Sequence, residues 1–210
     1  MKIKKKELIV QLYLPELLCN IGWGLTLPAL PRLANEFSGD LSGASVVVAL
    51  IAAGTLLFNI PAGLIAANIS RRMITVSTLT FFILASILAG ISNNLIILCI
   101  AGFLMGSCRA SWMVSRMLIA RTTIKKDLRG RVLASIGGMN RIGSFAIGPA
   151  LGGFISTKIG LHAPFFTLGL FLFASAIVIL VWTPKIQPSP TQFQYTENHQ
   201  LITVINQNWK

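Results

Sequence analysis

Four charged residues, Glu16, Arg109, Arg116 and Arg141, lie inside apolar stretches that are long enough to cross a bilayer. A charged side chain at the centre of a membrane costs several kcal/mol, so such residues usually face the interior of a helix bundle or a water-filled path. A carboxylate in such a place binds a cation or carries a proton, and a nearby arginine influences its protonation. These residue types therefore indicate the movement of a solute or an ion across a membrane.

The composition of the chain is that of a membrane protein. Of its 210 residues, 54% are hydrophobic and only 11% are charged, which leaves too little polar surface for an ordinary soluble globule. A membrane-spanning helix needs roughly 20 mostly apolar residues. Six stretches meet this length: Leu8–Leu30, Gly43–Ile69, Met73–Ile91, Leu95–Leu118, Val132–Thr157 and Pro164–Trp182. The predicted fold is an all-α membrane protein with six transmembrane helices in residues 1–183.

The net charge of +12 is split among the predicted loops and ends of the chain. With a cytoplasmic N-terminus, 13 of the 18 Lys and Arg residues lie on the cytoplasmic side, and only Arg32 and Lys158 lie on the other. This asymmetry follows the positive-inside rule and predicts a multi-pass protein of the cell (inner) membrane with both termini cytoplasmic. A nucleic-acid partner would need the charge on one folded face, so we expect none.

The other reactive residue types form no catalytic or metal-binding pattern. Cys19, Cys99 and Cys108 fall within predicted spans without metal or redox spacing, and His162 and His199 have no partners at ligand spacing. The glycine pairs lie within spans and are too short to cradle a phosphate. We therefore expect a protein that is not an enzyme and that uses no metal and no cofactor.

The first span ends with Gly22, Pro28 and Pro31 in the pattern G-x-x-x-x-x-P-x-x-P. This pattern resembles the first helix of the major facilitator superfamily, in particular of its drug exporters. Proline lacks an N–H and disfavours helix in the residue before it, so we expect the two prolines to end the helix near the outer membrane surface.

The segment from Gly63 to Arg72 is predicted to form the loop between spans two and three. It is similar in register to the family's G-x-L-A-D-R-x-G-R-R loop, and it keeps the first glycine and the closing pair Arg71 and Arg72. The family's aspartate is Ala67 here, so the charge interaction that the resemblance implies is lost. We interpret the two arginines as determinants of membrane topology.

Span four departs from the family pattern. Gly102 replaces the arginine of the R-x-x-Q-G element of proton-coupled exporters, but Arg109 and Arg116 lie seven and fourteen residues further on. They therefore share roughly one helix face with Gly102. Arg116 lies close to the cytoplasmic interface, and we interpret it as an anchor whose side chain extends to that surface.

Span five carries the most specific resemblance. Residues 144–153 are similar to the antiporter motif G-x-x-x-G-P-x-x-G-G, with matches at Gly148, Pro149, Gly152 and Gly153. Small or weakly polar residues recur every four positions from Asn140 onward. They make a helix face on which a neighbouring backbone can approach closely, and the proline adds a bend.

The resemblance implies one half of a major facilitator fold, a 3+3 inverted repeat in which spans one, four and five line the central cavity. At about 1.5 Å per residue, Glu16, Arg109 and Arg141 lie about 12, 9 and 14 Å from the inner face. We hypothesise that Glu16 and Arg141, supported by Arg109 and with Asn140 beside them, line a substrate or proton pathway. The alternative is a buried ion pair that only fixes helix packing.

Residues 184–210 are predicted to form a cytoplasmic linker with a short amphipathic helix on the membrane surface, marked by Leu201, Val204, Ile205 and Trp209. Transporters of this type bind substrate between two halves. The chain then represents part of an ion-gradient-coupled efflux transporter that lacks its C-terminal half, a half that pairs with a second copy, or a six-span protein with a structural or regulatory role. The expected partners are membrane lipid and a small-molecule substrate, with protons as a candidate coupling ion.

Overall fold

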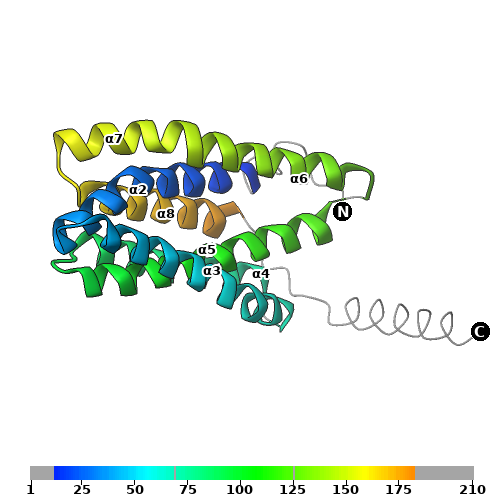
Figure 1. The fold of residues 1–210 in the computed structure, drawn as a ribbon. Coiled ribbons are helices and arrows are strands. Elements are labelled where there is room, and N and C mark those ends of the chain that lie inside the picture. Colours follow the sequence, from blue (N-terminus) through cyan, green and yellow to red (C-terminus); the bar gives the residue numbers. More distant parts are fainter. Residues whose placement is uncertain (1–11, 69, 125, 183–210) are drawn as a thin grey trace, which may run out of the picture.

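A computed structural model describes residues 12–68, 70–124 and 126–182, and the regular elements within these ranges are helices (Figure 1). The helices lie side by side in a bundle with short connections (Figure 1). The predicted linker and amphipathic helix of residues 184–210 lie outside the described residues. The elements are α2 (Leu14–Ser38), α3 (Leu41–Asn68), α4 (Arg71–Gly90), α5 (Leu95–Thr123), α6 (Lys126–Arg141), the π-helix η2 (Ile142–Ile147), α7 (Gly148–Lys158) and α8 (Ala163–Trp182).

Four of the described helices are long and apolar enough to cross a membrane: Ser42–Ala66, Arg72–Gly90, Leu95–Leu118 and Ala163–Trp182. They coincide within a few residues with the second, third, fourth and sixth predicted spans. α2 does not meet this measure, and it contains Glu16, Asn20 and internal prolines. The fifth predicted span lies within the helical run α6–η2–α7, which is divided into three pieces.

The prediction that Pro28 and Pro31 end the first helix is wrong. Both lie inside α2, which continues to Ser38. A proline removes only its own backbone hydrogen bond, and within a bundle the neighbouring helices hold the rest of the helix in place. The helix ends instead at Gly39, which adopts φ 74° and donates its N–H to the carbonyl of Asn35 at 2.8 Å. A left-handed glycine is a common helix terminus because it has no Cβ to clash.

The fifth predicted span, Val132–Thr157, contains a π-helical segment at its centre. The backbone has right-handed helical angles at Arg141 and at Gly148, so the chain passes through η2 without a break. Pro149 stands in the first turn of α7 and has no N–H to donate to the preceding turn. A π-turn next to a proline is a recognised way for a helix to accommodate such a defect.

α5 is central to one side of the bundle and α2 to the other. Both α3 and α4 pack on α5 but hardly touch each other, whereas α8 packs on α2 and α4. The apolar core that these contacts bury includes Leu33, Phe82, Met105, Phe165 and Leu172. We call α6, η2 and α7 together the fifth helical run. α2 is thus held between the core and the fifth helical run.

α2 and α7 meet through glycine, as the antiporter-like motif predicts. Gly148 lies against Gly24, and a Cβ added at Gly152 would lie on the Leu25 carbonyl oxygen and 2.7 Å from the Leu25 Cα. Without side chains at these positions the two backbones approach each other directly. Gly153 points elsewhere, because a Cβ added there would meet no atom within 4 Å.

Gly152→Ala should therefore lower the free energy of unfolding by about 1–3 kcal/mol, the usual cost of forcing a methyl group into a packed interface. Gly153→Ala is the matched control and should change it by less than about 1 kcal/mol, or stabilise the helix slightly. Thermal unfolding of both variants in detergent measures the difference. Equal unfolding temperatures would contradict the close contact between α2 and α7.

Candidate functional site

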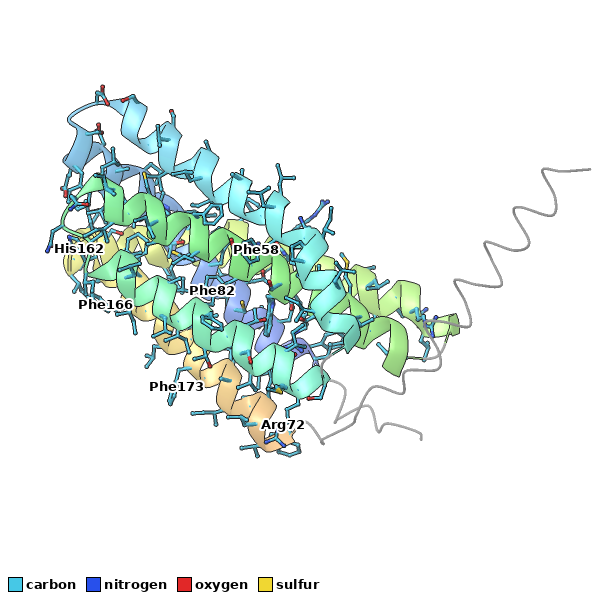
Figure 2. All side chains as sticks on the ribbon, turned by 90° about the horizontal axis from the view of Figure 1, so that it is seen from below. Phe58, Arg72, Phe82, His162, Phe166 and Phe173 are labelled. Carbon is cyan, nitrogen blue, oxygen red and sulfur yellow. The ribbon has the colours of Figure 1, made fainter. Side chains whose placement is uncertain are left out.

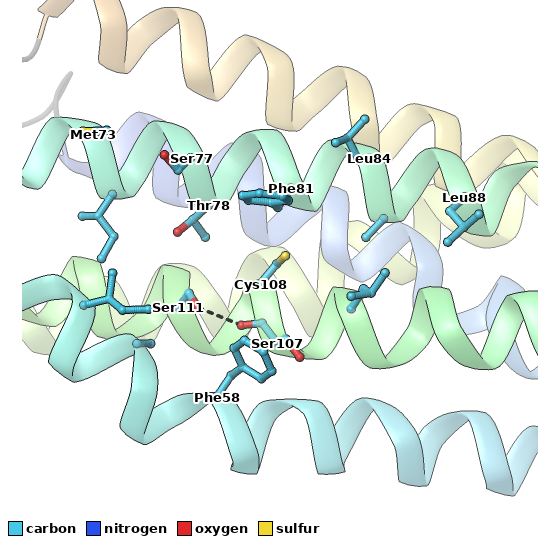
Figure 3. Close-up of a pocket in the computed structure, with 15 residues that line it drawn as sticks. Phe58, Met73, Ser77, Thr78, Phe81, Leu84, Leu88, Ser107, Cys108 and Ser111 are labelled. Atoms are coloured by element: carbon cyan, nitrogen blue, oxygen red, sulfur yellow. Dashed lines mark hydrogen bonds between the residues drawn. The ribbon is translucent and has the colours of Figure 1, made fainter. Parts of the chain in front are cut away.

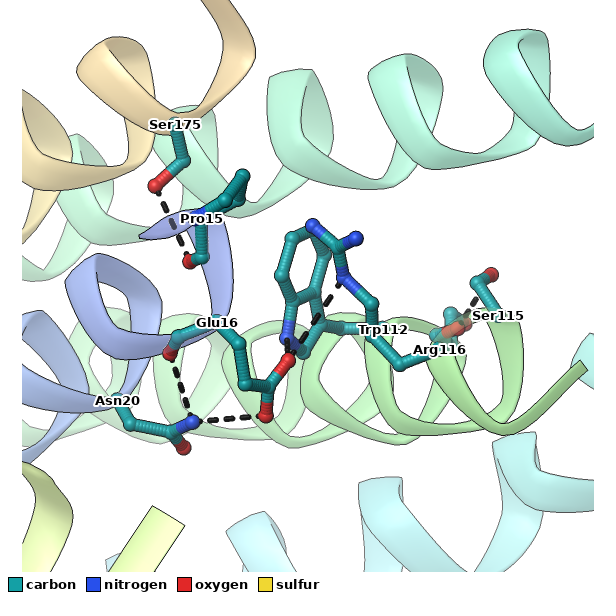
Figure 4. Close-up of polar contacts among 8 residues, drawn as sticks. Pro15, Glu16, Asn20, Trp112, Ser115, Arg116 and Ser175 are labelled. Carbon is teal, nitrogen blue, oxygen red and sulfur yellow. Dashed lines mark hydrogen bonds and ion pairs between the residues drawn. The ribbon is translucent and has the colours of Figure 1, made fainter. Parts of the chain in front are cut away.

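Glu16 lies in the first turn of α2 and is only 2% exposed. The side-chain amide of Asn20, one turn along the helix, donates 2.8 Å hydrogen bonds to Glu16 Oε1 and to the Glu16 backbone carbonyl. The indole Nε1 of Trp112 on α5 donates to the other carboxylate oxygen, Oε2, at 3.1 Å (Figure 4). A buried carboxylate needs such donors because it has left water.

The cation that pairs with Glu16 is Arg116. Its Nε lies 3.7 Å from Glu16 Oε2, and its side chain is 3% exposed. The guanidinium also lies 4.0 Å above the Trp112 ring centroid, a cation–π contact that adds to the ion pair (Figure 4). Trp112 and Arg116 stand four residues apart on α5, so both reach the same carboxylate.

Two expectations about the arginines are therefore corrected. Arg116 is not an anchor that extends to the membrane surface, since its side chain is buried against Glu16. The expected pairing of Glu16 with Arg141 is replaced by pairing with Arg116, and Arg141 is exposed at the end of α6. Depth along a helix follows from counting residues, but it does not fix which way each helix face turns.

The polar contacts continue from Glu16 into the fifth helical run. Ser144, in η2, donates to the Asn20 backbone carbonyl at 3.2 Å and to Asn20 Oδ1 at 3.3 Å. At the start of α2, Ser175 of α8 donates to the Pro15 carbonyl at 3.4 Å (Figure 4). We call Glu16, Asn20, Trp112, Arg116 and Ser144 the buried polar network; it joins α2, α5 and η2.

Arg109 occupies a second, similar position two turns before Arg116 on α5. Its guanidinium carbon lies 4.6 Å from the centroid of the Trp23 ring on α2, and its side chain is half-buried. Trp23 in turn packs on Phe82, with ring centroids 6.1 Å apart. The boundary between α2 and α5 thus holds two arginines, each stacked on a tryptophan. Their seven-residue spacing places both on roughly one face of α5.

A cavity of about 210 Å³ opens beside the buried polar network. Glu16, Arg116 and Asn140 contribute its polar lining. Asn140 and Glu16 thus line the same cavity, while Arg141 is not among the lining residues. The remaining lining is apolar or small: Met113, Met117, Leu133, Ile136 and Gly137.

A larger cavity of about 690 Å³ lies between α3, α4 and α5. Figure 3 shows Phe58 of α3 on one side, Phe81 and Thr78 of α4 on the other, and Ser107 and Cys108 of α5 between them. Its lining carries no charged side chain. Sequence patterns did not indicate this cavity, because it arises from the separation of α3 and α4 and from no particular residue.

The segment from Gly63 to Arg72 is mostly helical, contrary to the predicted loop. α3 continues to Asn68, and α4 begins at Arg71 after Ser70, whose hydroxyl accepts a hydrogen bond from the Met73 N–H. Arg72 donates to the Leu180 carbonyl at 2.8 Å, in the last turn of α8 (Figure 2). A cation is favourable at a helix C-terminus, so Arg72 has a structural contact besides any effect on topology.

Within the described ranges, no three His, Cys, Asp or Glu side chains come together in the way that a metal ion would require. Cys19, Cys99 and Cys108 are free thiols. The buried polar network consists of a carboxylate, a guanidinium, an amide, an indole N–H and a hydroxyl, groups that offer charge, hydrogen bonds and proton exchange.

Sequence reasoning missed Asn20, Trp23 and Trp112 as members of these contacts. A usable signal exists for two of them: Asn20 stands four residues after Glu16, and Trp112 stands four before Arg116. Residues at this spacing are neighbours on a helix surface. A search for donors one turn from each embedded charge would have found both.

The family model described as Major Facilitator Superfamily matches residues 14–209 of the chain. This chain belongs to the major facilitator superfamily. It is a multi-pass membrane protein of a transporter family, and the expected family resemblance is confirmed.

Several superfamily members that the chain resembles are drug-resistance proteins. It is 29% identical over 178 residues to the multidrug resistance protein MdtL of Vibrio parahaemolyticus, covering 84% of this chain and 45% of that protein. Identity is 30% to multidrug resistance protein 1 of Bacillus subtilis, over 90% of this chain and 48% of that protein. The chain is 31% identical to the class B tetracycline resistance protein of Escherichia coli, over 79% of this chain and 41% of that protein.

A solved structure shares the fold. The human organic anion transporter MFSD10 superposes with a TM-score of 0.72 at 18% identity, covering 92% of this chain and 52% of that one. The chain thus spans about half the length of the major facilitator proteins that it matches.

Arg116→Met should lower the free energy of unfolding by about 3–5 kcal/mol, because it leaves the buried Glu16 carboxylate without its cation. The double variant Glu16→Gln with Arg116→Met should recover much of this loss, since both charges are then gone. Denaturation of the three variants in detergent gives the coupling between the pair. Arg32→Met, on an exposed position of α2, is the control, and strictly additive effects of the two changes would contradict the ion pair.

Proposed function

We propose that this chain is a six-helix half of a transporter that exports small molecules across a membrane and draws on an ion gradient. The observation that carries the proposal is the buried polar network beside a cavity, with Glu16 and Arg116 both lining that cavity. Charges inside a membrane protein are costly and mark solute or ion pathways. The names of the relatives as multidrug and tetracycline resistance proteins support efflux as the direction.

Glu16 is the residue that couples the cavity to the ion gradient in this proposal. Its carboxylate is held by Asn20, Trp112 and Arg116, so protonation or solute binding must rearrange contacts that reach η2. Arg109, Asn140 and Arg141 complete the proposed pathway along α5 and α6. The structural alternative, in which the pair only fixes helix packing, predicts no role in transport.

The proposed topology places both termini in the cytoplasm of a cell whose inner membrane the protein crosses six times. The distribution of Lys and Arg supports this orientation. The cavity beside Glu16 lies at the end of the bundle where α2 begins and α5 ends. In this orientation the cavity lies at the cytoplasmic end of the bundle, the side from which an exporter takes its substrate.

A second half is needed to close the pathway, because transporters of this kind bind their substrate between two halves. We propose that the fifth helical run faces it. A Cβ added at Gly130, Gly138 or Gly153 would meet no atom within 4 Å, so the run is open to a close neighbour at these positions. Either a C-terminal half or a second copy of this chain is the proposed partner.

Glu16→Gln should abolish energised uptake of substrate into everted membrane vesicles, because glutamine cannot exchange a proton. The panel of labelled compounds includes tetracycline and small anionic, cationic and neutral aromatic molecules, with and without a protonophore. Glu36→Gln, an exposed acid on the same helix, is the matched control and should transport like the wild type. Unchanged transport by Glu16→Gln, together with a lower unfolding temperature, would assign the pair to packing alone.

Gly138→Leu should leave the unfolding temperature of this half within a few degrees, because a Cβ at this position meets no atom within 4 Å and the residue does not line the cavity beside Glu16. It should nevertheless lower transport at least about tenfold, since a 1.4 kcal/mol loss of docking to the second half is already tenfold. Phe173→Trp, which enlarges an exposed side chain on α8, is the control for bulk at the lipid surface. Full transport by Gly138→Leu would place the second half on another face.

A further inference from the structure

Arg141 presents a charge on the surface of the fifth helical run, which lies along one edge of the bundle (Figure 1). Its side chain is exposed at the end of α6. No described residue forms a hydrogen bond, an ion pair or a cation–π contact with it, whereas Arg109 and Arg116 each stack on a tryptophan. Arg141 therefore needs an anion or water from outside this half.

The depth of Arg141 makes its charge costly. The residue stands nine positions into the fifth predicted span, about 14 Å from the inner face and close to the midplane of a hydrocarbon core about 30 Å thick. Arginines near helix ends extend their side chains to the membrane surface, but a residue at this depth is too far from it. Charges at mid-membrane usually pair with an opposite charge inside a bundle or face a water-filled path. We therefore expect protein and not lipid to cover Arg141.

Arg141 lies on a helix face that is open to a close neighbour. Gly130, Ala134 and Gly138 precede it at spacings of four, four and three residues, which places all four on one face of α6. A Cβ added at Gly130 or Gly138 would meet no atom within 4 Å, and Ala134 is exposed. Small residues of this kind let a neighbouring helix approach closely in a membrane. A helix that docks on this face therefore comes close to the Arg141 guanidinium.

A second copy of this chain cannot supply the anion. Two parallel copies related by a two-fold axis along the membrane normal present the same residues at the same depth, so both Arg141 side chains would lie at one level of the interface. Glu16 is the only Asp or Glu in the six predicted spans, and its buried carboxylate is held by Asn20, Trp112 and Arg116. Like charges placed together away from water repel each other strongly. Pairing of two copies through this face is thus disfavoured.

We propose that the second half is a segment different from this one, and that it places an Asp or Glu carboxylate against Arg141 at the midplane. This inference rests on the proposed transport function and selects between the two partners named there. The relatives have room for such a segment, since this chain spans about half of their length. The face with Gly130 and Gly138 supplies close packing, and the ion pair sets the depth at which the two halves meet.

In the test, the Arg141→Glu variant of this chain serves as the acid-bearing partner. Full chains carrying a donor or an acceptor fluorescent protein at the N-terminus are reconstituted in liposomes, and energy transfer is followed as lipid dilutes the protein. A mixed pair of wild type and Arg141→Glu should associate at least about tenfold more tightly than either pair of identical chains. A mixed pair that is no tighter than both identical pairs would overturn the proposal.

Further variants control for charge and for the face. Arg32→Glu, at an exposed position of α2, should pair with the wild type no better than the wild type pairs with itself. Gly138→Leu in both chains should weaken the mixed pair at least about tenfold by separating the helices. Unchanged mixed pairing of the Gly138→Leu chains would place the contact on another face and overturn the proposal.

Arg141→Gln keeps the test decisive if Arg141→Glu does not fold. With the like charges gone, Arg141→Gln chains should pair with each other more tightly than wild-type chains do. Equal pairing would show that Arg141 does not oppose self-association, and it would overturn the proposal.

The association assay needs no transport, so it separates this inference from the proposed function. Equal pairing in all mixtures, together with energised uptake that depends on Glu16, would overturn the acid-bearing partner and preserve transport. A tight mixed pair without energised uptake of any compound would support the acid-bearing partner and contradict transport.

Discussion

Burial of the Glu16 carboxylate is the constraint on which the site depends. An ionised acid away from water must recover its lost hydration from donors and from a cation. Here the donors come from one turn along the same helix and from α5, and the cation also comes from α5. Satisfying one carboxylate therefore fixes how α2 and α5 face each other, and the Asn20–Ser144 contacts extend this constraint to η2.

The close contact between α2 and α7 also fixes the position of α2, at a point further along the helix than Glu16. Glycine at Gly24, Gly148 and Gly152 lets the two backbones touch, and packing of this kind is a main source of helix association in a membrane. α2 is thus held by polar groups near its start and by backbone contact further along. The cavity beside Arg116 occupies the space that these two attachments leave open.

Much of the fold follows from the sequence because hydrophobic length is a strong signal. The spans at α3, α4, α5 and α8 were placed within a few residues, and two glycines of the G-P-x-x-G-G core, Gly148 and Gly152, contact α2 while Gly153 does not. The end of α2 was misplaced, because the effect of Pro28 and Pro31 depends on neighbouring helices that no local pattern describes. The same limit applies to the partner of Glu16. Depth along a helix follows from counting residues, whereas the rotation of α6 that turns Arg141 outward is set by tertiary packing.

The π-turn between Arg141 and Gly148 divides the fifth helical run into two mechanically different parts. Beyond it, α7 is joined to α2 by direct backbone contact, so these two segments form one stiff unit. Before it, α6 packs on the start of α2 and the end of α5 through a small apolar cluster that includes Leu12, Ile124 and Val132. A wider turn with a looser hydrogen-bond ladder tolerates a change of helix angle better than an α-turn does. Ser144 stands at the junction of these two parts, so its contacts with Asn20 tie the buried polar network to the point where the helical geometry of the run changes.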